Sequence, residues 1–120
     1  GDKAGIRRFG SRYAPLDESL ARAVVDLSGR PYAFVELGLV RESLGGLACE
    51  NIQHFVTSLA NAAMMTVHLD VIRGQNDHHR AEAGFKALAL ALREAVAIDG
   101  SYGARVPSSK GTLGGGEGAA

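Results

Sequence analysis

The chain is organised around residues 76–96, NDHHRAEAGFKALALALREAV. The Ala- and Leu-rich part of this segment has apolar residues at helical spacing and predicts a helix. Phe85, Leu88 and Leu92 form a stripe on it that can pack on a sheet. Asn76 and Asp77 are N-cap candidates, so the polar residues that follow them should lie in the first helical turn.

This first turn carries the motif HHxxE. His78 and Glu82 are four residues apart, and His79 and Glu82 are three apart, so the carboxylate can share a metal ion with one histidine. Adjacent histidines diverge by roughly 100° around the helix axis and need not bind the same ion. Imidazole with carboxylate suits zinc, manganese or iron. Because HHxxE is short, a polar helix start with ordinary capping is the alternative interpretation.

The composition excludes several classes of protein. The 120 residues are enough for one domain with a modest core, and the 13 basic and 13 acidic residues give no case for general attraction to nucleic acid or membranes. The single cysteine, Cys49, excludes an internal disulfide and fits a reducing compartment. No apolar run is long enough to span a bilayer and no signal peptide is visible, so we expect a cytoplasmic protein.

Alternating apolar residues predict strands before and between two helices. Residues 6–13 are a short strand candidate, and residues 20–28 and 32–39 should pair as an antiparallel hairpin across a Gly-Arg-Pro turn. The Ala-rich start of the first hairpin strand would also suit a helix. Residues 49–64 predict the first helix, and residues 66–73 a further strand. The order β-β-β-α-β-α predicts an α+β fold with both helices on one face of a sheet.

Three further segments each allow two interpretations. Arg30, between Gly29 and Pro31, is either a solvated loop tip or an anion clamp. His54, at the edge of the first helix's apolar stripe, is either a hydrogen-bonded boundary residue or a metal ligand. Residues 106–111, VPSSKG, offer hydroxyls, an ammonium and backbone N–H groups for a phosphate, but this is also the composition of a disordered tail. The Gly-rich residues 112–120 predict disorder.

Five motifs together resemble imidazoleglycerol-phosphate dehydratase, the dehydratase of histidine biosynthesis. They are GIRRFG (5–10), PLDE (15–18), DLSGRPY (26–32), NDHHRAEAGFKALA (76–89) and VPSSKG (106–111), and the text between them is most similar to fungal members. The resemblance implies a subunit made of two duplicated half-domains, each like domain 2 of ribosomal protein S5. It implies that this chain is the C-terminal half, with residues 1–105 as the half-domain, 106–111 as a phosphate-binding segment and 112–120 as a tail.

The resemblance also implies roles for individual residues. It implies two manganese ions per active site and a homo-oligomer of the 24-subunit octahedral type. The positions that match metal ligands are His54, His78, His79 and Glu82, with Glu82 and His79 also in catalysis. The positions that match substrate and phosphate contacts are Arg8, Asp17, Arg30, Lys86, Ser108 and Lys110.

The implied reaction is the hydro-lyase step that converts imidazole glycerol phosphate to imidazole acetol phosphate. The hydrogen removed lies on a carbon next to the imidazole ring and is not very acidic, so a Lewis acid on the ring nitrogen would help. The phosphate is remote from the bond broken, and its binding energy fixes orientation. The competing hypothesis is a non-catalytic domain that uses metal only for assembly. A metallohydrolase lacks support because the sequence has no HExxH.

Overall fold

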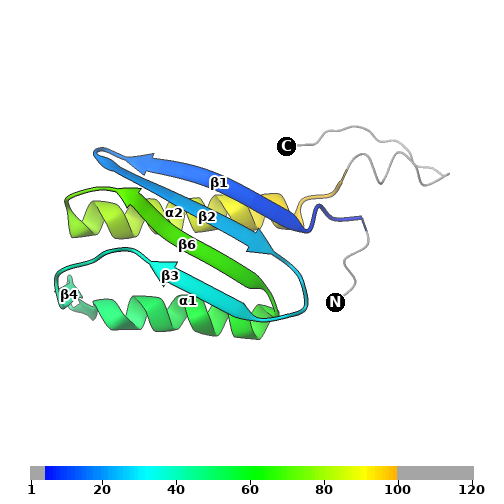
Figure 1. Ribbon diagram of the computed structural model, residues 1–120, viewed down its shortest axis with the longest axis horizontal. Coiled ribbons are helices and arrows are strands. Elements are labelled where there is room, and N and C mark those ends of the chain that lie inside the picture. Colours follow the sequence, from blue (N-terminus) through cyan, green and yellow to red (C-terminus); the bar gives the residue numbers. More distant parts are fainter. Residues whose placement is uncertain (1–4, 100–120) are drawn as a thin grey trace.

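The computed structural model describes residues 5–99 (Figure 1). Its elements are β1 (Phe9–Leu16), β2 (Ser19–Asp26), β3 (Tyr32–Glu36), β4 (Ser43–Leu44), β5 (Leu47–Ala48), α1 (Cys49–Ala63), β6 (Thr66–Arg73) and α2 (Asp77–Val96). Apart from the small β4–β5 hairpin, this is the predicted order, and the α+β class is confirmed. The predicted boundaries of the phosphate-binding segment and the tail lie outside the described residues.

The main sheet has four strands in the order β1-β2-β6-β3. Strand β2 pairs antiparallel with both β1 and β6, whereas β3 runs parallel to β6. The predicted hairpin between residues 20–28 and 32–39 is therefore wrong, because β6 lies between these two strands. After β2 the chain crosses the start of β6, where the N–H of Gly29 donates to the Met64 carbonyl at 2.8 Å. Val67 and Leu69 of β6 are fully buried, as expected for an inserted central strand.

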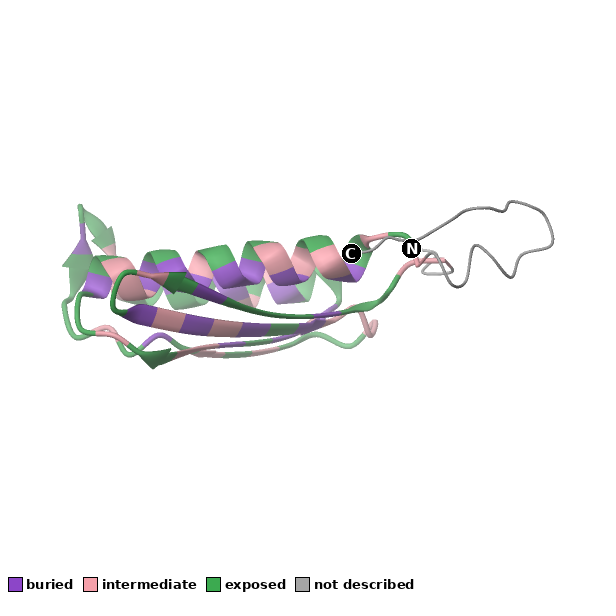
Figure 2. Ribbon diagram, turned by 90° about the horizontal axis from the view of Figure 1, so that it is seen from above, coloured by how far each residue is buried: buried purple, intermediate pink, exposed green. Residues whose placement is uncertain are grey.

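Both helices cover the same face of the sheet, as predicted (Figure 2). Small residues line the contact between α2 and the sheet, with Ala87 and Ala91 fully buried. On β1, a Cβ added to Gly10 would overlap the backbone carbonyl of Ala91. Glycine at this position therefore lets α2 lie directly against β1.

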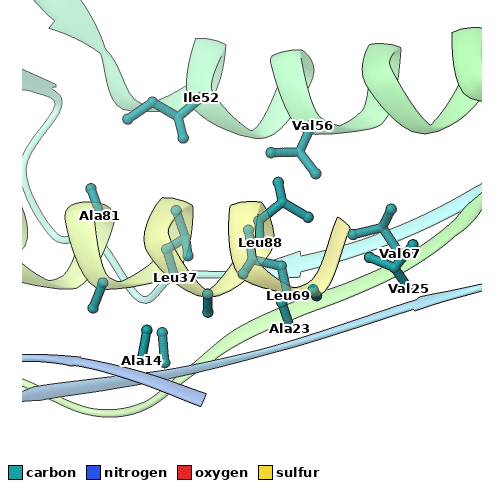
Figure 3. Close-up of a cluster of buried hydrophobic side chains, with 14 of the residues drawn as sticks. Ala14, Ala23, Val25, Leu37, Ile52, Val56, Val67, Leu69, Ala81 and Leu88 are labelled. Atoms are coloured by element: carbon teal, nitrogen blue, oxygen red, sulfur yellow. The ribbon is translucent and has the colours of Figure 1, made fainter. Parts of the chain in front are cut away.

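Helix α1 buries a narrower side than its apolar pattern predicts. Ile52 and Val56 face the core (Figure 3), and Ala60 is buried with them, whereas Phe55 is 56% exposed. Helix α1 lies over the edge strand β3 and not over the centre of the sheet, so only one line of its side chains is covered. The Phe55 ring instead meets Phe85 of α2 edge-on, with the ring centroids 6.2 Å apart.

Neither helix within residues 5–99 has the length and apolar character needed to cross a membrane.

Candidate functional site

The HHxxE motif lies in the first turn of α2, as predicted. Asn76 is the N-cap, and its side chain accepts a hydrogen bond from the backbone N–H of His79 at 3.1 Å. Asp77, the other cap candidate, has a different role. The residue is 5% exposed, and its carboxylate accepts hydrogen bonds from the backbone N–H groups of Val40 at 3.1 Å and Arg41 at 2.7 Å. Asp77 thus fastens the loop after β3 to the start of α2.

Arg80 fixes the same turn from its other side. Its Nε donates to the Leu37 carbonyl at 2.7 Å, and its Nη1 donates to the Gly74 carbonyl at 2.6 Å. These bonds connect α2 to the end of β3 and to the loop that leaves β6. Arg80 was not among the predicted site residues. In the sequence, only its position next to the two histidines suggested that Arg80 helps to hold this turn in place.

The ring of His79 contacts the turn between β1 and β2. Figure 1 shows the start of α2 at the same end of the molecule as this turn. Its Nδ1 is 2.7 Å from Glu18 Oε1, and its Nε2 is 3.6 Å from Asp17 Oδ2. The hydrogen bond to Glu18 is the main cause that raises the pKa of His79, with smaller contributions from the charges of Glu18, Asp17 and Glu82. The structure therefore joins two predicted site residues, Asp17 and His79, although they are distant in the sequence.

Glu18 is a site residue that the sequence analysis missed. Its Oε2 accepts hydrogen bonds from the backbone N–H groups of Asn76 at 2.9 Å and Gln75 at 3.0 Å. These two bonds, followed by the contact with His79, hold the pKa of Glu18 well below its ordinary value. The sequence feature that could have indicated this role is the pair of adjacent acidic residues, Asp17 and Glu18, in a tight turn.

His78, Glu82 and Lys86 are all exposed along α2. They follow the four-residue spacing that places side chains on one side of a helix. The ammonium of Lys86 lies 3.5 Å from the Pro15 carbonyl, so this cation is also close to the β1–β2 turn. His78 is exposed while His79 faces Glu18, which agrees with the predicted divergence of the two rings.

The predicted metal ligands do not form one complete site in this chain. His54 is exposed on α1, whereas the other three are on α2. Among residues 5–99, no three His, Cys, Asp or Glu side chains gather closely enough to hold a metal ion. The donor chemistry nevertheless fits a divalent transition metal, because imidazole suits zinc or iron and carboxylate suits manganese. The start of α2 presents two imidazole groups and one carboxylate, which are groups of the kind that bind such ions.

The predicted phosphate contacts fall into separate regions. Arg8 precedes β1 and Asp17 follows it, so the eight residues of that strand place them about 25 Å apart. Arg8 is exposed and donates from Nε to Asp26 at 2.8 Å, which raises the pKa of the guanidinium. Arg30 lies at the same end of the sheet, where its carbonyl accepts a hydrogen bond from Thr66 Oγ1 at 3.1 Å. Ser108 and Lys110 lie outside the described residues.

A family model described as imidazoleglycerol-phosphate dehydratase matches residues 1–92. The chain belongs to the imidazoleglycerol-phosphate dehydratase family. It is 59% identical over 113 residues to the imidazoleglycerol-phosphate dehydratase of Kluyveromyces lactis, a match that covers 94% of this chain and 50% of the relative. With the Saccharomyces cerevisiae enzyme of the same name it shares 61% identity over 109 residues, covering 91% of this chain and 49% of that one. The predicted likeness to fungal members of this family is confirmed.

Two solved structures of the family have the same fold. The crystal structure of imidazoleglycerol-phosphate dehydratase from Staphylococcus aureus matches with a TM-score of 0.77 and 43% identity, covering 81% of this chain and 57% of that one. The structure from Pyrococcus furiosus, in complex with (S)-C348, matches with a TM-score of 0.71 and 38% identity, covering 89% and 58%. The chain spans about half the length of the curated relatives it matches.

Proposed function

We propose that this chain supplies part of a metal-dependent active site that dehydrates imidazole glycerol phosphate to imidazole acetol phosphate in histidine biosynthesis. The observation that carries the proposal is the first turn of α2 in a chain of this family. That turn presents His78, His79 and Glu82, and the carboxylates of Asp17 and Glu18 lie beside it. Because the chain spans about half of its relatives, the activity belongs to the complete polypeptide. We propose that this chain is its second half-domain.

His54, His78, His79 and Glu82 are the proposed ligands of two manganese ions. A bound ion supplies Lewis-acid chemistry that withdraws electron density from the imidazole ring of the substrate. The divergence of His78 and His79 favours ligation of different ions, with Glu82 sharing the ion of one of them. Since no three candidate ligands gather within residues 5–99, the other ligands would come from the rest of the subunit or from a second copy.

The side chains around the turn would orient the substrate. Lys86 lies seven residues beyond His79, a distance of about 10 Å along the helix, and is suited to a small anionic group. Asp17 is 76% exposed and lies beside His79, where it can accept a hydrogen bond from a substrate hydroxyl. Glu82 is exposed on the same turn and can relay a proton in addition to holding a metal ion.

The positions of Arg8 and Arg30 favour an oligomer. They lie at the end of the sheet opposite His79, about 25 Å away, so one chain cannot bring both groups to one small substrate. We propose that these arginines bind the phosphate in the active site of a neighbouring copy, within the octahedral homo-oligomer. Ser108 and Lys110 would complete this phosphate site.

The proposal is tested by assaying the full-length polypeptide for imidazole acetol phosphate. Turnover should stop when a chelator removes the metal and should return when Mn²⁺ is added. The particle mass is measured in the same samples, because metal is also expected to hold the copies together. Assembly that depends on metal without any dehydration of the substrate would instead favour the assembly-domain hypothesis.

A further inference from the structure

The two carboxylate oxygens of Glu18 have different partners. Oε2 accepts hydrogen bonds from the backbone N–H groups of Gln75 and Asn76, at 3.0 and 2.9 Å, and from the Ser19 hydroxyl at 3.0 Å. Oε1 lies 2.7 Å from Nδ1 of His79. Three donors hold Oε2 in place, so the carboxylate cannot rotate without losing them. The orientation of Oε1 toward His79 is therefore set by the loop between β6 and α2.

This contact determines which nitrogen of His79 carries a proton. A carboxylate oxygen only accepts hydrogen bonds, so Nδ1 of His79 must be the donor. In the neutral ring Nε2 then carries the lone pair, which is the form that can bind a metal ion. Nε2 faces the side of Asp17, whose exposed carboxylate is 3.6 Å away. A carboxylate behind a histidine ring commonly orients a metal ligand in this manner.

We propose that Glu18 is a positioning residue, which holds His79 in the Nδ1–H tautomer and so presents its Nε2 lone pair to a metal ion. The tautomer follows from the geometry of the chain alone, whereas the ligand role of Nε2 rests on the proposed function. The residue acts only through His79 and needs no contact with the substrate.

The substitution Glu18→Gln should change the tautomer of His79 without changing the fold. Glutamine has one acceptor oxygen, and the three donors on the Oε2 side should take it, so the loop stays in place. Its amide NH₂ would then face His79. Because an NH₂ group donates, Nδ1 would have to accept, and the proton of the neutral ring would move to Nε2. We expect Glu18→Gln to reverse the tautomer of His79 and to leave the backbone unchanged.

The tautomer is read from ¹⁵N chemical shifts of the imidazole rings in the 120-residue chain, at a pH well above the histidine pKa. The chain has four histidines, and loss of a signal in His79→Gln assigns the one that matters. His68, whose ring centroid is 5.6 Å from that of Tyr32 and 6.0 Å from that of Phe34, is the internal reference. Asp17→Asn removes the other nearby negative charge, 3.6 Å from Nε2, and Ser19→Ala removes one donor to Oε2. Both controls should keep the Nδ1–H form.

Titration with Mn²⁺ then tests the ligand role in the full-length polypeptide. Glu18→Gln should weaken binding by about 10- to 100-fold, the usual effect of losing a group that orients a metal ligand. An Nε2–H tautomer in the wild-type chain would overturn the proposal even if the variant failed to fold. A reversed tautomer with unchanged Mn²⁺ affinity would overturn the ligand role. If the wild type takes up no Mn²⁺, the proposed metal site fails, and the tautomer measurement still decides whether Glu18 positions His79.

Discussion

The buried carboxylate of Asp77 accepts a hydrogen bond from the backbone N–H of Arg41 at 2.7 Å. The same oxygen accepts the N–H of Val40 at 3.1 Å. These bonds hold the loop after β3 against the first turn of α2, where the two histidines lie. The placement of the candidate ligands therefore depends on a residue that is not itself a ligand.

Removing the Asp77 carboxylate should destabilise the fold. Asp77→Ala removes the shared acceptor of two backbone N–H groups, which should lower the free energy of unfolding by roughly 1–3 kcal/mol. Asp77→Asn keeps one acceptor oxygen of the same shape and should cost less than Asp77→Ala. Chemical denaturation measures both. Glu36→Gln, at an exposed position of β3, is the control and should change stability by no more than about 0.5 kcal/mol. Equal stability of Asp77→Ala and the control would contradict a supporting role for Asp77.

The contact between Gly10 and α2 gives a second stability test. Gly10→Ala places a methyl group into the backbone carbonyl of Ala91, so the helix must move away from β1. We expect a loss of about 1–3 kcal/mol or more, because neither backbone can yield freely. Gly45→Ala is a useful comparison, since its Cβ meets nothing within 4 Å but its φ is +56°. It should cost about 1 kcal/mol from backbone strain alone. A Gly10→Ala variant as stable as the parent would show that α2 does not lie this close to β1.

Local pattern was sufficient to predict the elements but not their pairing. The alternation in β2 and β6 and the helical spacing in α2 identify these elements correctly, because each pattern is complete within one segment. The hairpin error has a different origin. Strands that follow each other usually pair, and nothing in their own sequences shows that a strand from residues 66–73 inserts between them. The central position of that strand depends on how all the elements pack together, so its own sequence does not reveal it.

The same distinction separates the site residues that were predicted from those that were missed. His78, His79 and Glu82 are neighbours in the sequence, so helix geometry alone places them in one turn. Glu18 reaches His79 across 61 positions, and Arg80 reaches Leu37 across 43. Contacts of this length depend on the β1–β2 turn meeting the start of α2, which no spacing rule predicts.

A prediction for the phosphate site concerns the proposed tail contact. In the full-length polypeptide, Lys110→Ala should weaken substrate binding and leave the manganese content unchanged, because Lys110 is proposed to contact only the phosphate. Loss of one charge-assisted contact should cost on the order of 1.5–3 kcal/mol. Binding is measured by calorimetry and metal by elemental analysis. Arg12→Ala removes an exposed cation of β1 that has no proposed role, and it should bind as the parent does. Parental affinity in Lys110→Ala would exclude the tail from the phosphate site.

The central prediction concerns the two histidines of α2. They diverge around the helix axis, with His79 turned to Glu18 and His78 exposed, so each should serve a different manganese ion. His78→Asn and His79→Asn in the full-length polypeptide should each remove part of the bound manganese. Both should reduce turnover by about 100-fold or more, since a Lewis acid contributes several kcal/mol to such a step.

Metal content, turnover and native mass of these two variants are measured with and without a chelator. His68→Asn, on the opposite face of the sheet from the helices, is the matched control and should retain metal and activity. If the two variants lose the same ion, the histidines act as a pair and the divergence has no role in metal binding. If both keep full metal and normal turnover, the HHxxE turn is only a capped helix start. The proposed dehydratase site would then have to lie elsewhere, because the roles proposed for Asp17, Glu18 and Lys86 all depend on that turn.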